Sequence, residues 1–268
     1  MEKKLDVSVI LPIKSAVTKD FDEFFDKSIQ SLKNQLVQIN ELVIVHTSEE
    51  QLVEKIKNYD FGDINVKSYT WEEKPNYCDQ VNFGIDKANS EWISIFEFDD
   101  EYSKIWFSNV EKYINFYPEV DAYLPLVVDV DTKGVFAGFT NEAVFAVNFT
   151  QEMGFLTNDT LHNYQNFQTA GMVIRKKTFQ DYGKLKASIK LTFIYELLLR
   201  LTYNSVKIMT IPKIGYKHVN FREGSIFWNY KNGDERLSED EIKFWIQTAK
   251  KEYFFTDDRS IKYESQTA

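Results

Sequence analysis

The apolar positions in the first half of the chain alternate between two spacings. Short, nearly continuous apolar runs are typical of strands that are buried on both faces. They occupy residues 7–11, 42–45, 66–71 and 92–98. Between them, apolar residues recur at helical intervals over residues 20–36, 48–59 and 81–88. This order predicts an α/β fold with a mostly parallel, doubly wound sheet and crossover helices.

Capping signals mark the start of three predicted helices. A capping box pairs a polar N-cap with an acid or amide three residues later. The pairs are Asp20 with Glu23, Ser48 with Gln51, and Ser238 with Glu241.

The second half of the chain is less regular. It predicts a helix at 105–117, a strand at 123–130 and an aromatic hairpin at 134–149, followed by a polar functional loop at 150–168. A helix at 191–201, a strand at 206–211 and a last helix ending near 255 complete it. We therefore expect one domain over residues 1–228 and a packed helical extension with a short tail over residues 229–268.

Composition narrows the classes of function. The net charge of −9 argues against non-specific binding to nucleic acid or anionic membranes. Cys78 is the only cysteine, which excludes an intramolecular disulfide and a thiolate zinc cluster. The chain shows neither a signal peptide nor an apolar membrane span. We expect a cytoplasmic protein, or one of the host cytoplasm if the viral-looking composition reflects its source.

The fourth predicted strand runs into the acidic segment Glu97-Phe98-Asp99-Asp100-Glu101. If the strand stays extended through Asp99, Glu97 and Asp99 share one face. Clustered carboxylates repel one another, so such a cluster calls for a cation, and hard oxygen ligands favour Mg²⁺ or Mn²⁺. The alternative is an acidic start to the helix at 105–117.

Several short motifs follow one another in a recognisable order. They are Val-Ser-Val-Ile-Leu-Pro at 7–12, Ser-Leu-Lys-Asn-Gln at 31–35, Glu-Leu-Val-Ile-Val at 41–45, Asn-Phe-Gly-Ile-Asp-Lys-Ala at 82–88, Glu-Phe-Asp at 97–99, Ala-Gly-Met-Val-Ile-Arg at 170–175, Leu-Arg-Leu at 199–201 and Glu-Gly-Ser-Ile at 223–226. With this order and spacing the chain resembles family 2 glycosyltransferases, which have the GT-A fold, over about residues 5–228.

The resemblance implies a fold, a reaction and a set of site residues. A nucleoside diphosphate sugar, with a UDP-sugar expected, binds at the strand ends; Mn²⁺ or Mg²⁺ holds the diphosphate, and a carboxylate takes the proton of an acceptor hydroxyl, with inversion at the anomeric carbon. The metal ligands implied are Asp99, Glu97 and His218. The donor-binding residues implied are Pro12, Lys14, Ser15, Glu41, His46, Thr47, Asp79, Asn82, Glu97 and Arg222.

The chain departs from the family pattern in ways that bear on catalysis. Two acidic residues usually follow the second strand, where this chain has His46 and Thr47. The usual catalytic Glu-Asp pair falls at Phe193 and Ile194, neither of which can act as a base. Glu196 is the nearest acid and is our candidate base, although with Arg200 four residues later it would also make an ordinary helix ion pair.

Other assignments remain open. Asp159 and Asp181 are further candidates for the base. Trp71, Tyr77, Tyr102 and Trp106 offer a surface on which a sugar could stack, but the default for aromatic residues is the core.

Two alternatives compete with an active glycosyltransferase. One is a degenerate relative that binds a nucleotide or glycan without turnover, and the other is a virion or scaffold protein that keeps only the fold. A saccharide, a lipid-linked glycan or a protein is the expected acceptor. The acidic net charge argues against a hydroxylated DNA base, which stays an alternative.

Overall fold

The computed structural model describes residues 4–16, 20–74, 76–142, 144, 154–164, 166–220 and 222–264. The strands are β1 (Leu5–Ile13), β2 (Ile39–Thr47), β3 (Val66–Trp71), β4 (Trp92–Ile95), β5 (Glu101–Tyr102), β6 (Ala122–Val130), β7 (Phe136–Thr140), β8 (Phe155–Leu156), β9 (Val173–Arg175) and β10 (Ile208–Val219). The helices are α1 (Phe21–Lys33), α2 (Glu50–Asn58), α3 (Tyr77–Lys87), α4 (Trp106–Phe116), α6 (Asn158–Asn163), α7 (Lys176–Tyr182), α8 (Phe193–Tyr203), α9 (Ile226–Asn232) and α10 (Glu239–Glu252).

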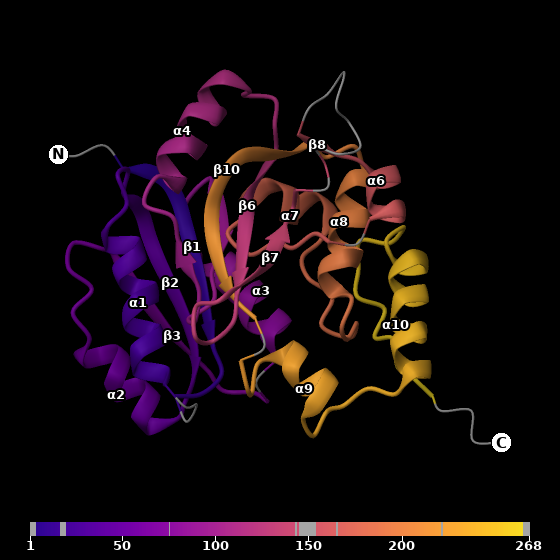
Figure 1. The fold of residues 1–268 in the computed structure, drawn as a ribbon, viewed down its shortest axis with the longest axis horizontal. Helices are drawn as coiled ribbons and strands as arrows, with labels where there is room; N and C mark the ends of the chain where they lie inside the picture. Colours follow the sequence, from indigo (N-terminus) through magenta and orange to yellow (C-terminus); the bar gives the residue numbers. More distant parts are fainter. Residues whose placement is uncertain are drawn as a thin grey trace.

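All these strands belong to one sheet, with a central order of β3-β2-β1-β4-β9-β6-β10-β5 (Figure 1). The first four strands are parallel to one another, as are β6 and β10. The short strand β9 runs antiparallel between β4 and β6. The carboxyl ends of β1, β4 and β10 therefore open on the same edge of the sheet. The predicted mostly parallel α/β fold is confirmed.

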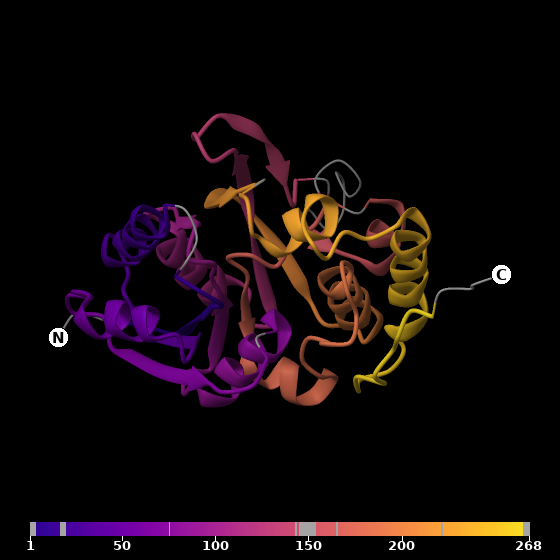
Figure 2. The ribbon, with the colours of Figure 1, turned by 90° about the horizontal axis from the view of Figure 1, so that it is seen from below.

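Helices cover both faces of the sheet and bury a separate apolar cluster on each. One cluster takes residues from α1, α2 and α4, and the other from α3, α6, α7, α8 and α10. Each strand therefore has apolar residues on both faces, which explains the nearly continuous apolar runs. Figure 2 shows α10 at the far side of the molecule from the N-terminus, packed beyond α8. α10 adds Trp245, and the following turn adds Tyr253, to the same cluster as α3, although the boundary at residue 228 stays a prediction.

Of the three predicted capping boxes, one is confirmed. Ser238 and Glu241 bond reciprocally at the start of α10. The predictions at Asp20 and Ser48 are wrong. Asp20 has a left-handed conformation and makes no side-chain cap bond, and α2 begins after Glu49.

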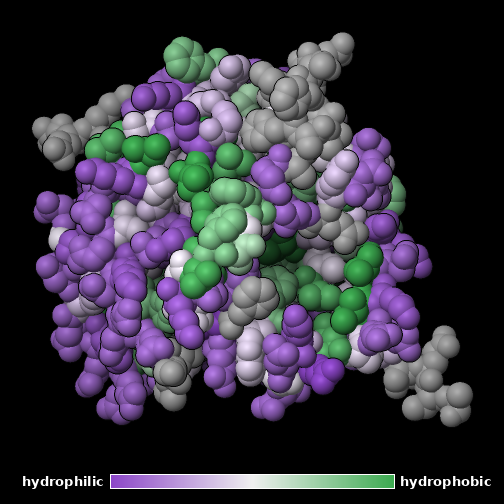
Figure 3. Space-filling view, in the orientation of Figure 1, coloured by the Kyte–Doolittle hydropathy of each residue, from purple (hydrophilic) through white to green (hydrophobic). Residues whose placement is uncertain are grey.

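The second half of the chain differs from expectation in three places. The hairpin expected at 134–149 is β7 paired with β6, but residues 143 and 145–149 lie outside the described part. β7 and the preceding turn expose Val135, Phe136 and Phe139, and apolar side chains gather over this strand in Figure 3. Within the described part of 150–168, β8 and α6 replace the expected loop.

β10 runs eight residues past the predicted end at Ile211 and reaches Val219. Register shifts on either side of Ile214 let it bend while it stays paired with β6. Gly215 passes directly over the Trp106 ring, where an added Cβ would lie 2.3 Å from a ring carbon. This bent extension is what carries His218 to the edge of the sheet where β1 and β4 end.

None of the helices in the described ranges combines the length and apolar character that a bilayer crossing requires.

Candidate active site

The acidic segment forms a turn rather than an extended strand. β4 ends at Ile95, after which the Phe96 amide donates to Ile10 and the Asp100 amide donates to the Glu97 carbonyl at 3.2 Å. β5 then pairs antiparallel with β10. The prediction that Glu97 and Asp99 share one strand face is wrong, because the period of two ends with the strand. The alternative is not observed either, since α4 has no acidic residue in its first turn.

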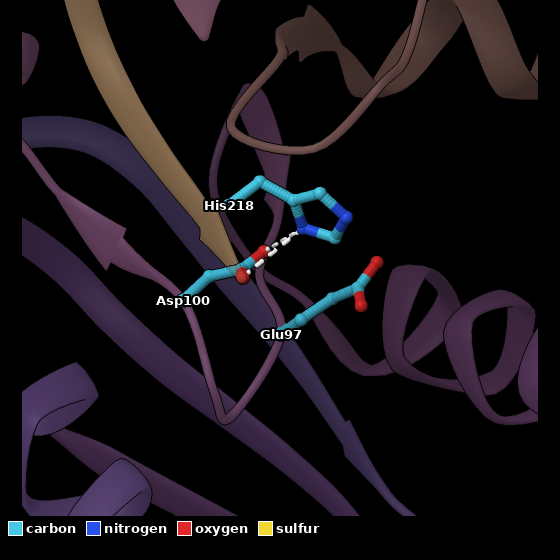
Figure 4. Close-up of side chains that lie close together, drawn as sticks. All are labelled: Glu97, Asp100 and His218. Carbon is cyan, nitrogen blue, oxygen red and sulfur yellow. Dashed lines mark hydrogen bonds and ion pairs between the residues drawn. The ribbon is translucent and has the colours of Figure 1, made fainter. Parts of the chain in front are cut away.

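The turn brings Glu97 and Asp100 to His218 on β10. Nδ1 of His218 lies 2.9 and 3.1 Å from the two carboxylate oxygens of Asp100, and the Val219 amide donates to Asp100 at 2.8 Å. One ligand atom from each of Glu97, Asp100 and His218 lies within 4.8 Å of the others. Figure 4 shows the carboxylates of Glu97 and Asp100 on the same side of the imidazole ring, with Asp100 next to Nδ1. We call these three residues the cleft cluster.

The cleft cluster is strained electrostatically. Burial, followed by the charge of Asp100, raises the pKa of Glu97 to about 8. Burial opposes the charge on His218, but the adjacent Asp100 carboxylate outweighs it and raises the pKa of His218 to about 10. A nearby divalent cation would relieve the repulsion among these carboxylates. Carboxylate oxygens with one imidazole suit Mn²⁺ better than Mg²⁺, so the donor set fits the metal that the family resemblance implies.

Asp99 takes a different partner from the one predicted. It forms an ion pair with Arg222, whose guanidinium lies 4.6 Å above the centre of the Phe98 ring. The second oxygen of Asp99 is buried and has no hydrogen-bond partner within the described part of the chain. Asp99 is therefore not in the three-residue cluster, where Asp100 lies instead, and its role as a metal ligand stays a prediction. The orphan oxygen gives a cation or a water molecule a place to bind beside it.

A cleft of about 870 Å³ opens in front of these residues. Pro12, Lys14 and Ser15 line it at the end of β1, and Glu97, Asp99, His218 and Arg222 line its middle. The opposite side consists of Ala187, Ser188, Ile189, Lys190, Phe193 and Ile194, together with most of α9. The site thus sits at the carboxyl ends of parallel strands, as expected for an open α/β sheet.

The side of the cleft opposite β1 is rich in aromatic residues. Phe193 and Phe227 stack with ring centres 6.1 Å apart and planes 11° apart, and Tyr77 lies 5.7 Å from Phe193. No residue of α9 is buried. Four of its apolar and aromatic residues line the cleft: Ile226, Phe227, Trp228 and Tyr230. Tyr77 is the one of four suggested stacking aromatics that lines the cleft. Trp106 and Tyr102 lie in the core, as the default interpretation has it.

Glu196 does not reach the cleft. It is fully buried on α8, 2.9 Å from both the Arg200 Nε and the Lys186 Nζ. Arg200 also donates to the carbonyls of Gly183 at 2.8 Å and Lys184 at 2.7 Å. Both carboxylate oxygens are engaged and the side chain does not line the cleft, so the geometry corrects our candidate base to a structural residue. We call Lys186, Glu196 and Arg200 the buried junction.

Four of the expected donor-binding residues lie outside the cleft lining. Glu41 sits near the start of β2, at the opposite end of the sheet, where Ser8, Asn89 and Lys67 satisfy its carboxylate. A residue at the amino end of a strand cannot contact a ligand at the carboxyl ends, so that expectation is corrected.

The other three are held by neighbours. His46 is buried between the Thr47 carbonyl and the Ser68 hydroxyl, each at 2.8 Å. The Thr47 hydroxyl donates to the Lys14 carbonyl. Asn82 bonds to both the amide and the carbonyl of Leu185. These side chains shape the loops around the cleft rather than lining it.

Asp79 does line the cleft, at the first turn of α3. Burial, and then the charges of Asp258 and Glu73, raise its pKa. Of the two further candidates for the base, Asp181 pairs with Lys177 on an exposed helix face and Asp159 lies in the first turn of α6, and neither lines the cleft.

Three parts of the site were not among the residues expected from the sequence: Asp100, the segment 187–190 and the aromatic residues of α9. Asp100 was visible as part of the acidic run, but only the turn identifies it as the partner of His218. The other two groups carry no motif. An exposed aromatic run on a short helix, Ile-Phe-Trp-Asn-Tyr at 226–230, is the one signal that could have pointed to them.

Comparisons with known proteins agree with the observed fold. A family model described as Glycosyl transferase family 2 matches residues 8–183, more than half of the chain. No curated protein sequence matches the chain.

Solved structures of TarS residues 1–349 from S. aureus are similar in fold. The structure in complex with UDP has a TM-score of 0.63 at 17% identity and covers 91% of this chain and 64% of that one. The complex with UDP-GlcNAc has a TM-score of 0.60 at 20% identity and covers 84% and 61%. A third TarS 1–349 structure gives 0.59 at 18% identity over 80% and 60%. The chain thus spans less than two thirds of these TarS structures.

Proposed function

Because this chain belongs to glycosyl transferase family 2, we propose that its cleft binds a nucleoside diphosphate sugar and transfers the sugar to an acceptor hydroxyl. The observation that carries this proposal is the cleft cluster beside Arg222, at the carboxyl ends of β1, β4 and β10. A diphosphate with a divalent cation matches this set of charges. Arg222 offers its guanidinium to phosphate oxygens, and the carboxylates offer oxygens to the cation.

The donor lies along the cleft in a defined direction. The nucleoside occupies the side of Pro12, Lys14 and Ser15, and the diphosphate occupies the middle. The sugar then points toward the segment 187–190 and α9. TarS, which shares the fold, is known in complexes with UDP and UDP-GlcNAc, and we propose a UDP-sugar as the donor.

Glu97, Asp100 and His218 would hold Mn²⁺. When bound, the metal stabilises the negative charge of the departing diphosphate. Arg222 adds a fixed positive charge on the same side of the cleft, and the pair that it forms with Asp99 keeps its guanidinium in place. Both effects act where charge develops as the bond to the sugar breaks.

We assign proton removal to Asp79. It lines the cleft, and no ion pair joins it to any residue that the structure describes. Its raised pKa brings it closer to neutral pH, where a general base is most effective. In the reaction, the acceptor oxygen bonds to the anomeric carbon while the bond from that carbon to the diphosphate breaks. The hydroxyl proton moves to the Asp79 carboxylate, and displacement from the opposite side inverts the anomeric configuration.

The aromatic side of the cleft suits a saccharide acceptor. Exposed rings such as Phe227 offer flat apolar surface next to polar groups, including Asn229 and Asn232 on the same helix. Ligand sites commonly combine apolar walls with a few polar groups in this way.

A second function is favoured by one observation. Phe193 and Ile194 line the cleft where the family resemblance implies a catalytic acid pair. A protein that binds a nucleotide sugar without transferring it would show this feature if Asp79 did not replace the missing base.

Two measurements separate these functions. Thermal unfolding with a panel of nucleoside diphosphates and their sugars, with and without Mn²⁺, should show a shift that needs both the metal and one nucleotide. Transfer of radiolabelled sugar from that donor to saccharide acceptors should then be lost in Asp79→Asn, while donor binding is retained. Binding without transfer in the wild-type protein would support the second function, and no metal-dependent shift with any donor would refute both.

A further inference from the structure

The wall of the cleft opposite β1 depends on the last part of the chain. Residues 184–192, which we call the wall segment, contribute Ala187, Ser188, Ile189 and Lys190 to the cleft lining. The wall segment is not part of a helix or strand, so contacts from outside must fix its course. It also lies beyond the residues that the family model matches.

On its α3 side, the wall segment is anchored before it enters the cleft. Asn82 bonds to both backbone groups of Leu185, at 2.8 and 3.0 Å. Lys184 pairs with Asp86. These contacts fix residues 184 and 185 but leave the cleft-lining residues to be held by something else.

The C-terminal segment, residues 239–260, supplies that support at three points. The buried Lys186 ammonium donates to the carbonyls of Glu252 at 2.7 Å and Phe255 at 2.8 Å. A cation at the carboxyl end of a helix is favourable there, because the last carbonyls lack helix partners. At the other end of the wall segment, the Thr192 hydroxyl donates to the Trp245 carbonyl at 2.7 Å.

The third point lies within the cleft lining itself. Asp258 accepts from the Ser188 amide at 2.9 Å with one carboxylate oxygen and from the Ser188 hydroxyl with the other. The Ser260 amide donates to Asp258 at 3.0 Å, and Arg259 beside it forms a two-bond pair with Glu252. The carboxylate that holds Ser188 is therefore itself fixed to the end of α10.

None of the described residues of the C-terminal segment lines the cleft, so any effect on substrate must pass through the wall segment. From this geometry we propose that Asp258 is a positioning residue, through which the C-terminal segment fixes the part of the cleft wall that contacts the transferred sugar. The proposal rests on the donor orientation given under the proposed function. Residues 239–260 would then affect substrate binding without contacting the substrate.

The test compares UDP with UDP-GlcNAc in the full chain. Titration calorimetry with Mn²⁺ should show that Asp258→Ala raises the dissociation constant of UDP-GlcNAc by roughly threefold to tenfold, the range expected for lost hydrogen bonds. The dissociation constant of UDP should change less than about twofold on the same reasoning, because UDP does not reach the wall segment. Asp258→Asn keeps one oxygen acceptor and should lie between. Asp257 is exposed and adjacent in sequence, so Asp257→Ala removes the same charge and serves as the control. Its dissociation constants for both ligands should equal those of the wild-type protein.

If Asp258 had a purely structural role, Asp258→Ala would raise the dissociation constants of UDP and UDP-GlcNAc by the same factor. That outcome would overturn the proposal. Unchanged affinity for both would overturn it as well. Hydrogen exchange gives a readout that needs no ligand, since the Ser188 amide should exchange faster in Asp258→Ala while β1 and β4 keep their protection. If wild type binds neither ligand, the proposed donor fails, but faster exchange confined to residues 187–190 would still support the positioning role, and unchanged exchange would refute it.

Discussion

The buried junction and the cleft cluster are both built from carboxylates and cations, yet their charges are balanced in different ways. In the junction, Glu196 has two cationic partners, and the cations have further backbone carbonyls. At the cleft cluster, the carboxylates of Glu97, Asp100 and the adjacent Asp99 share two cationic partners within the described part of the chain, His218 and Arg222.

The consequence appears in protonation and in unsatisfied groups. The pKa of Glu97 is raised to about 8 by burial and by Asp100, and one oxygen of Asp99 lacks a partner in the described part of the chain. A complete set of partners marks charges that hold the fold together. An incomplete set of partners indicates charged groups that are available to bind a ligand.

The largest expected effect is on stability when the junction is broken. Glu196→Gln leaves Lys186 and Arg200 buried without a carboxylate, and should lower the free energy of unfolding by about 3–5 kcal/mol. Urea unfolding measures this. Glu235→Gln, at an exposed carboxylate of the cleft, should stay within about 0.5 kcal/mol of wild type. Wild-type stability together with lost transfer in Glu196→Gln would return this residue to the role of base.

The next effect concerns the cleft cluster and its metal. Mn²⁺ at a hundred times its dissociation constant should stabilise the wild-type protein by about 2.7 kcal/mol. Glu97→Gln removes a charged ligand and should abolish most of that gain in a thermal unfolding assay. Glu101→Gln changes a nearby carboxylate that pairs with Lys217 instead, and should keep the gain. Equal stabilisation of both variants would remove Glu97 from the metal site.

A smaller effect should appear in the pH dependence of the metal-free protein. Folding keeps a proton on Glu97 up to about pH 8, whereas the unfolded chain releases it near the ordinary pKa of 4.5. The folded state therefore binds more protons in this window, and the free energy of unfolding should fall as the pH rises.

With chelator present, we expect a loss on the order of 1–2 kcal/mol between pH 5 and pH 6.5. The unfolded form of His218 begins to lose its proton near pH 6.5, so the window from pH 5 to 6.5 reports best on Glu97. Glu97→Gln should flatten the curve there. A curve identical to that of wild type would show that the Glu97 carboxylate is already ionised when the protein is folded.

The smallest effect is expected at an exposed ion pair beside the junction. Lys184 and Asp86 lie 2.5 Å apart, but their side chains are 29% and 60% exposed. Solvent screens such a pair, and Lys184→Ala should cost less than about 0.5 kcal/mol by urea unfolding. A cost similar to that of Glu196→Gln would mean that burial does not explain the strength of the junction.

The sequence by itself determined the elements of the first half of the chain. Apolar periodicity places β1 to β4 and α1 to α3 within a few residues of their observed bounds, because a strand buried on both faces and a helix buried on one face each need a fixed spacing. The acidic run after Phe96, the cations of the closing segment and the spacing of Glu196 from Arg200 are likewise properties of the local sequence.

The tertiary structure decided which of these groups meet. After β4 ends at Ile95, the Asp100 amide bonds to the Glu97 carbonyl and closes a turn, and this turn selects Asp100 over Asp99 as the partner of His218. His218 arrives there because β10 bends and continues beside β6. Glu196 and Arg200 pair within α8, and Lys186, which lies outside that helix, adds a second cation to complete the buried junction. Such contacts join residues far apart in the chain, and a local pattern of polar and apolar positions carries no record of them.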